Sequence, residues 1–258
     1  MISKSQLKFY ASLKNRKARE ESGLFIVEGH KIVEEGLRST CPCAQAFVRE
    51  GFFGRDEETD RLLSNRNVEV LDEKEFRRLS ETENPQGVLA VFDHRSLIVP
   101  TVGADTVIAL FDVADPRNMG TIIRSADWFG LEELVVGETC VDIFNEKVVR
   151  STMGSIFHCR FRLAPDLVEE LRALKSDYRV VTADMGGIDY RGRRRGGKSL
   201  LVFSNEARGP SQEILGLSDE IVTIPGSGEA ESLNVSCAAA IIMADLAFPR
   251  PCTGPGQP

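Results

Sequence analysis

The chain has 258 residues, of which 42% are hydrophobic and 28% are charged, a composition typical of a globular protein rather than a disordered or fibrous one. Its formal net charge of −7 argues, taken alone, against binding to nucleic acid. No apolar stretch approaches the ~20 residues of a membrane span, and the first residues lack the apolar core of a secretory signal, so we expect a cytoplasmic protein with reduced cysteines.

Residues 1–96 are predicted to form a small α/β domain. Leu7, Tyr10 and Leu13 recur at helical spacing within a basic segment, so a helix is expected over residues 5–21. Short apolar runs then alternate with amphipathic segments. The expected strands are residues 24–28, 44–49, 68–71 and 87–93, and the expected helices are residues 30–38, 59–65 and 73–81.

A second alternation of strands and helices follows residues 97–104, which contain Pro100 and Gly103 and are predicted to be a linker. Residues 106–112 are nearly all apolar, which is typical of a strand in a buried parallel sheet. We therefore expect a second α/β domain over residues 105–250 and a disordered tail over residues 251–258. Its further strands are expected at 133–136, 159–163, 178–183, 200–204 and 220–224, and its helices before Gly130 and at 145–153, 165–176 and 233–248.

Positive charge is concentrated in two short runs. Residues 1–20 hold six basic residues and one acidic residue, and residues 191–198 hold five basic residues and no acidic one. Such runs are often a solvated helix face or a flexible turn, but an acidic protein can also present a basic patch because salt screens charges beyond roughly 8 Å. The candidate phosphate-binding residues are Lys14, Arg16, Lys17, Arg19, Arg193 and Arg194.

Three polar segments follow expected strands, at the edge where open parallel sheets bind ligands. In the first, residues 112–130, a turn with Asn118 and Gly120 leads into a helix that carries Arg124. Glycine permits close approach of a ligand to the backbone, and a helix N-terminus offers free N–H groups to an anion. Taken alone, an arginine on such a helix can equally be structural.

The second and third segments suggest a pocket. Residues 200–211 end a buried strand in small and polar residues, without the G-x-G-x-x-G fingerprint of dinucleotide-binding proteins. Residues 222–242 run from a strand through a Pro-Gly turn into an apolar helix, and Ile224 and Leu233 could flank a planar ring. Ser232 or Asn234 could instead serve only as the N-cap of that helix.

Together the three segments resemble the SpoU (TrmH-like) family of RNA 2′-O-ribose methyltransferases of the SPOUT superfamily. Residues 25–37 and 83–91 are similar to the accessory substrate-binding domain of that family, so the resemblance covers nearly the whole chain. It implies an α/β catalytic domain with a deep trefoil knot, a smaller N-terminal α/β RNA-binding domain, and a homodimer whose active site uses both subunits. The residues that carry the resemblance are Asn118, Gly120, Arg124, Asn205, Glu206, Gly209 and the sequence IPGSGEAESLNVS at 224–236.

The resemblance also implies the reaction and its residues. S-adenosylmethionine would donate a methyl group to a ribose 2′-hydroxyl of structured RNA, ribosomal RNA being favoured over transfer RNA, and no metal is implied. The residues expected around the cofactor are Ser204, Asn205, Glu206, Gly209, Ile224, Pro225 and Leu233. Arg124 is expected to be the catalytic residue, supported by Asn118, Glu206, Ser232 and Asn234.

This chain departs from the family pattern in the second segment. Ser204 and Ala207 stand where the family has glycines, and Pro210 replaces a hydrophobic residue. A side chain at a position with positive φ would strain the loop. The alternatives to the favoured function are a transfer-RNA methyltransferase, a non-catalytic RNA-binding member of the same fold, and an unrelated nucleotide-dependent α/β enzyme.

Overall fold

The computed structural model describes residues 2–54, 56–194 and 196–248, so the expected tail over residues 251–258 lies outside the described residues. Packing divides the chain into two units, which are described separately. The first unit comprises residues 1–100, 115–124 and 141–161, and the second comprises residues 101–114, 125–140 and the chain from residue 162 onward. None of the helices in the described ranges has the length and apolar character needed to cross a bilayer.

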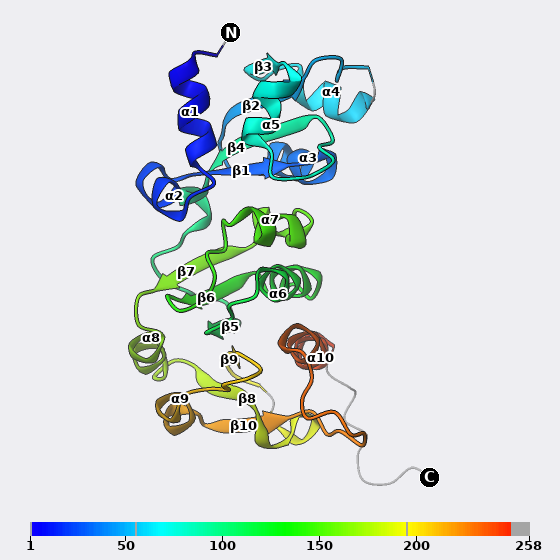
Figure 1. The fold of residues 1–258 in the computed structure, drawn as a ribbon. Coiled ribbons are helices and arrows are strands. Elements are labelled where there is room, and N and C mark those ends of the chain that lie inside the picture. The colour runs from blue at the N-terminus through cyan, green and yellow to red at the C-terminus, as the bar shows by residue number, and fades with distance from the viewer. Residues whose placement is uncertain (1, 55, 195, 249–258) are drawn as a thin grey trace. The chain divides into compact units, whose positions relative to one another are not determined.

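A four-stranded sheet in the order β1-β4-β2-β3 forms the centre of the first unit (Figure 1). Only the β2–β3 pair is parallel, while β4 runs antiparallel to both of its neighbours. The strands are β1 (Leu24–Glu28), β2 (Cys43–Arg49), β3 (Val68–Leu71) and β4 (Val88–Asp93). The helices are α1 (Lys4–Ser12), α2 (Arg16–Ser22), α3 (His30–Arg38), α4 (Glu57–Leu63), α5 (Glu73–Leu79) and α7 (Glu146–Thr152), with 3-10 turns at His94–Leu97 and Ser155–Phe157.

Both faces of this sheet are buried. On one face, Leu7 of α1 and Phe76 of α5 pack with Phe47 of β2 in a single apolar cluster. On the other face, α3 approaches so closely that a Cβ built at Gly36 would lie 2.4 Å from Cζ of Phe92. Alternate residues of each strand thus face different helices, as the two-residue period of a strand requires.

Two details of this unit differ from the prediction. The basic segment expected to be one helix over residues 5–21 forms two, because the chain turns at Leu13 and starts again with Asn15 as the N-cap of α2. The expected linker is partly paired. Ile98 forms a parallel bridge with Phe161, and the N–H of Val99 donates to the carbonyl of Phe161 at 2.9 Å.

A six-stranded sheet in the order β10-β8-β9-β5-β6-β7 forms the centre of the second unit, with β7 and α6 spanning the boundary between the units. The pairs β10–β8, β8–β9, β9–β5 and β5–β6 are all parallel, which confirms the predicted mainly parallel α/β architecture. The strands are β5 (Thr106–Phe111), β6 (Glu133–Gly137), β7 (Arg160–Ala164), β8 (Arg179–Asp189), β9 (Ser199–Ser204) and β10 (Glu220–Thr223). The helices are α6 (Pro116–Trp128), α8 (Leu167–Leu174), α9 (Gln212–Leu217) and α10 (Val235–Ala247), with a 3-10 turn at Tyr190–Gly192. Of these, α9 was not predicted from the sequence.

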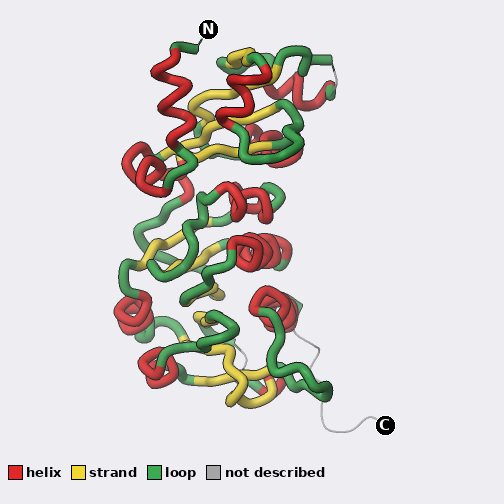
Figure 2. The backbone as a smooth tube through the Cα atoms, in the orientation of Figure 1, coloured by secondary structure: helices red, strands yellow, loops and turns green. Residues whose placement is uncertain are grey.

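Helices lie on both sides of this parallel sheet. Leu171 of α8 and Ile214 of α9 pack with Val107, Val180 and Val202 of the strands on one side. The C-terminal helix α10 lies on the opposite side (Figure 1). Because β8, β9 and β10 are parallel, their C-terminal ends meet at one edge, and the loops that leave this edge are shown in green in Figure 2.

Candidate functional site

A cavity of about 330 Å³ lies at the C-terminal edge of β8, β9 and β10, within the second unit. Phe203, Val222 and Ile242 give it apolar walls, and the three loops that follow the strands give it polar groups. The volume is at the lower end of the range of small-molecule sites, roughly 300–1,000 Å³. All seven residues expected around the cofactor line it, namely Ser204, Asn205, Glu206, Gly209, Ile224, Pro225 and Leu233.

The loop after β9 is held by the amide of Asn205. Its Oδ1 accepts from the N–H groups of Ala207 and Arg208, at 2.9 and 3.3 Å, and its Nδ2 donates to the carbonyl of Asp112 at 3.2 Å. Neither Ser204 nor Ala207 has a positive φ, so the strain expected where side chains replace the glycines of the family does not occur. Gly209 does have a positive φ of 65°.

The start of α10 is tied to the same loop. The Glu206 carboxylate accepts from Nδ2 of Asn234 at 3.3 Å and from the N–H of Val235 at 3.1 Å. Asn234 is also the N-cap of α10, since its Oδ1 accepts from the N–H of Ser236 at 2.9 Å. A carboxylate at a helix N-terminus is favoured by the helix dipole. Capping and site formation therefore coexist here, as the sequence allowed.

The loop between β10 and α10 forms the outer wall of the cavity. Pro225, Ser232 and Leu233 line it and are exposed. Asn234 does not line it, and its amide acts through Glu206 and the helix cap.

One wall of the cavity comes from β8, and the sequence did not indicate it. Ile221 of β10 pairs with Thr182, but the next residue, Val222, pairs with Ile188, so residues 183–187 leave the ladder as a bulge. Ala183, Asp184 and Met185 of this bulge line the cavity. The Gly-Gly pair at 186–187 inside a strand pattern was the available signal, because glycine within a strand often marks a bulge.

The first motif lies on α6, in the first unit. Arg124 is exposed, and its guanidinium makes no hydrogen bond or ion pair in the described ranges, whereas Asn118 is half-buried. Neither residue lines the cavity. The expectation that the start of this helix offers free N–H groups to an anion is wrong. The carboxylate of Asp115 already caps the helix start, accepting from the N–H groups of Arg117 and Asn118 at 2.7 and 3.1 Å.

Gly120 was expected to let a ligand approach the backbone. This expectation is also wrong, because the glycine allows two helices to pack. A Cβ at this position would lie 2.4 Å from Cβ of Ser151 and 2.7 Å from the carbonyl oxygen of Val148, both on α7. The glycine thus allows α6 and α7 to touch, and any side chain there would force them apart.

Two of the candidate phosphate-binding residues are not available to a ligand. Arg19 is buried, donates to Asp142 and the carbonyls of Leu13 and Lys14, and is only 4% exposed. Arg193 is similarly buried and pairs with Asp245. A buried guanidinium that is paired with a carboxylate is not exposed to a phosphate, so we remove both residues from the basic surface.

The other four candidates differ in how free they are. Lys14 is half-buried and donates to the carbonyl of Ser80 at 2.8 Å. Arg16 and Lys17 are exposed and pair with Glu20 and Glu21 one helical turn away, at 2.7 and 3.8 Å. Arg194 is also exposed.

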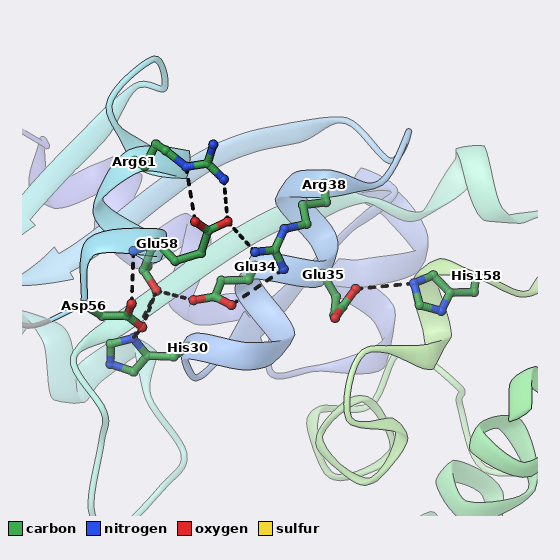
Figure 3. A network of polar contacts seen from close by, with 9 residues as sticks. His30, Glu34, Glu35, Arg38, Asp56, Glu58, Arg61 and His158 are labelled. Carbon is green, nitrogen blue, oxygen red and sulfur yellow. Dashed lines mark hydrogen bonds and ion pairs between the residues drawn. The ribbon is translucent and has the colours of Figure 1, made fainter.

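A polar network between α3 and α4 contains the residues of the described chain best placed to hold a metal ion (Figure 3). The possible ligand atoms of His30, Glu34 and Asp56 lie within 4.8 Å of one another. The hydroxyl of Thr59 lies among them, 2.6 Å from Oε1 of Glu34 and 3.0 Å from Oδ2 of Asp56. These hydrogen bonds account for the arrangement without an ion, and we regard the network as structural, joining the two helices.

Known protein families match both parts of the chain. The model of the SpoU rRNA Methylase family matches residues 105–244, and that of the MRM3-like substrate binding domain matches residues 4–90. The 23S rRNA (guanosine(2553)-2'-O)-methyltransferase RlmP of Bacillus subtilis is 34% identical over 244 residues, which cover 93% of this chain and 95% of that protein.

Two solved structures resemble the fold over nearly its whole length. The SpoU methyltransferase AviRb from Streptomyces viridochromogenes in complex with AdoMet has a TM-score of 0.81 and 27% identity, covering 95% of this chain and 97% of its own. The AdoMet-bound rRNA methyltransferase from Sinorhizobium meliloti has a TM-score of 0.79 and 28% identity, covering 96% of both chains. The chain belongs to the SpoU rRNA methylase family of S-adenosylmethionine-dependent RNA 2′-O-methyltransferases, as the three segments of its sequence predict.

Proposed function

We propose that the protein methylates the ribose 2′-hydroxyl of a nucleotide in ribosomal RNA, using S-adenosylmethionine as the methyl donor. The observation that carries this proposal is the cavity at the ends of β8, β9 and β10, which all seven expected cofactor residues line. Ribosomal RNA is favoured over transfer RNA because the matched family and the named relative from Bacillus subtilis act on it. Such a substrate also favours a cytoplasmic place of action.

The residues present fit this cofactor. Ile224, Leu233 and Ile242 supply apolar walls that suit the adenine ring, and the loops that follow the strands supply polar groups. Gly209, with its positive φ, leaves the backbone open at the floor of the cavity. When bound, the cofactor supplies a methyl group on a positively charged sulfur, which is already a good electrophile.

Because the methyl donor is activated in itself, the main task of the protein is to position the ribose oxygen. Positioning of this kind can lower the activation barrier by about 7–11 kcal/mol. We assign to Arg124 the contact with the 2′-oxygen or its neighbouring phosphate. A guanidinium keeps its charge at any ordinary pH, so it stabilises the alkoxide that develops as the hydroxyl loses its proton. Arg124 is exposed and has no ion-pair partner in the described chain, and both facts support this role.

The RNA would be held by basic groups that the fold leaves exposed. Arg16, Lys17 and Arg194 keep this role in the proposal, with Lys4 and Lys8 on α1 as additions. Lys14 would take part only if its hydrogen bond to Ser80 were exchanged for a phosphate. Contacts of this type fix the position of RNA and carry little sequence information.

We further propose a homodimer with the trefoil knot of the family. Trp128 of α6 is 81% exposed, and Phe248, which stands next to the C-terminal end of α10, is 69% exposed. The rings of Phe129 and Phe248 are 6.1 Å apart, so these large apolar side chains belong to one neighbourhood. Exposed apolar surface of this kind is typical of an interface. The knot is proposed because the chain belongs to the SpoU family, whose catalytic domain is knotted.

The function is tested by incubating the full chain with isotopically labelled S-adenosylmethionine and separated ribosomal and transfer RNA from cells that lack the protein, then mapping the labelled ribose. We expect label at a 2′-oxygen of ribosomal RNA. Label in transfer RNA alone would transfer the proposal to the alternative substrate, and binding of the cofactor without label in either RNA would favour a non-catalytic member of the fold.

The role of Arg124 is tested by Arg124→Ala, with Arg117→Ala on the same helix as the matched control. Loss of a group that stabilises the developing charge is expected to slow methylation by about 10²–10³-fold, while the Kd of the cofactor changes little. The control is expected to keep its activity, since Arg117 is exposed on the first turn of α6. Near-normal turnover of Arg124→Ala would refute the assignment.

A further inference from the structure

The cofactor cavity is acidic. Three carboxylates line it, those of Asp184, Glu206 and Glu231, and its lining of described residues includes no lysine, arginine or histidine. A cavity that receives an adenosyl group could use neutral hydrogen-bonding groups alone, so this excess of negative charge calls for a physical reason. Charge of one sign in a partly enclosed site attracts ligands of the opposite sign.

Asp184 is the carboxylate of this set that the fold leaves most available. It stands in the bulge of residues 183–187, where its Oδ1 accepts from the N–H of Gly186 at 2.9 Å. Its Oδ2 has no hydrogen-bonding partner in the described part of the chain, and it lies 3.5 Å from the position that a Cβ on Gly209 would occupy. The bulge and the turn at Gly186 thus hold a half-buried carboxylate oxygen beside Gly209, in the lining of the cavity.

The other two carboxylates are less suited to act on a ligand. Glu206 is engaged with Asn234 and the backbone of Val235 at the start of α10. Glu231 is exposed on the loop between β10 and α10, where water screens its charge. Asp184 is therefore the half-buried carboxylate of this lining that keeps an oxygen available to a ligand.

We propose that Asp184 makes the cavity selective for the charged methyl donor over the demethylated product. This inference rests on the proposed function, in which S-adenosylmethionine enters and S-adenosylhomocysteine leaves. The two ligands share the adenine, the ribose and the amino-acid group, and they differ in the sulfur, which is positively charged in the donor and neutral in the product. A carboxylate within the cavity attracts only the donor through this difference, since Coulomb attraction is strong where water is partly excluded. Loss of the charge on methyl transfer then weakens binding and favours product release.

The test measures the dissociation constants of three ligands by calorimetry, for the wild type and for Asp184→Asn. The ligands are S-adenosylmethionine, S-adenosylhomocysteine, and an analogue in which a carbon bearing a protonated amine replaces the sulfonium. Asparagine keeps the size of the side chain and the hydrogen bond to Gly186 but removes the charge. We expect the variant to bind the two charged ligands about tenfold more weakly and the neutral product within about twofold of the wild type, a size reasonable for one charge pair in a partly screened site.

A matched control is Asp177→Asn, which removes the same charge from an exposed residue of the second unit outside the cavity lining. It is expected to leave all three constants unchanged. As a second measurement, raising the salt concentration should reduce the preference of the wild type for the charged ligands, and this requires no variant.

The outcomes separate this inference from the proposed function. If Asp184→Asn weakens all three ligands equally, Asp184 binds a group that they share, such as the ribose hydroxyls, and selectivity by charge is wrong. Unchanged constants for all three ligands would also overturn it. If the wild type binds neither the donor nor the product, the proposed function itself fails.

Discussion

The interior of the first unit and the cavity of the second unit use charged side chains in opposite ways. In the interior of the first unit, Arg19 and Glu28 are buried and bond to other side chains of the protein. In the second unit, Asp184 and Glu206 line a cavity that is open to a ligand. A count of charged residues treats both groups alike. Only the fold distinguishes charges that stabilise the chain from charges that are available to a partner, and this is why the net charge of −7 does not exclude an RNA substrate.

The largest expected effect on stability is that of Arg19→Ala. The change would leave Asp142 without its partner in the interior, and breaking a buried ion pair typically costs about 3–5 kcal/mol. Arg16→Ala removes an exposed ion pair on the same short helix and is expected to cost less than about 1 kcal/mol. Denaturant unfolding of both variants measures the difference. Equal costs would mean that Arg19 is not the internal residue described above.

How far the sequence predicted the fold and the site depends on the type of signal. Strand alternation predicted both sheets, because apolar periodicity directly reflects burial. The loops of the cavity were predicted because their residues match a family motif. The bulge with Asp184 was missed, since its shape comes from pairing with β10, which periodicity cannot reveal. Arg19 and Arg193 were misassigned, because the acids that bind them, Asp142 and Asp245, are far away in the sequence.

A smaller effect, on RNA binding, is expected when the charge of the exposed basic residues of α2 is reversed by Arg16→Glu and Lys17→Glu. Each phosphate contact that is lost should reduce the slope of log affinity against log salt by about 0.7–0.9, so the double variant should show a slope shallower by roughly two and weaker RNA binding. Filter binding over a salt series measures this. Glu20→Gln with Glu21→Gln is the reciprocal control, since it frees the same basic groups and should strengthen binding. A slope that remains unchanged would place the RNA on another surface.

The last effect depends on pH and concerns Glu146, a largely buried acid of the first unit. Burial of Glu146 beside Glu81 and Glu28 raises its pKa from an ordinary value near 4.5 to about 8. The folded state therefore holds a proton that the unfolded chain releases, so the contribution of this group to stability is complete below pH 4.5 and is lost as the pH rises through about 8.

Glu146→Gln keeps the neutral form at every pH. Relative to the wild type, the variant should gain thermal stability between pH 6 and pH 9 and gain none near pH 4, as measured by melting temperature. The matched change Glu57→Gln, at an exposed position on α4 of the same unit, should show no such rise. A Glu146→Gln variant whose difference from the wild type is constant with pH would show that Glu146 is charged in the fold and that burial does not raise its pKa.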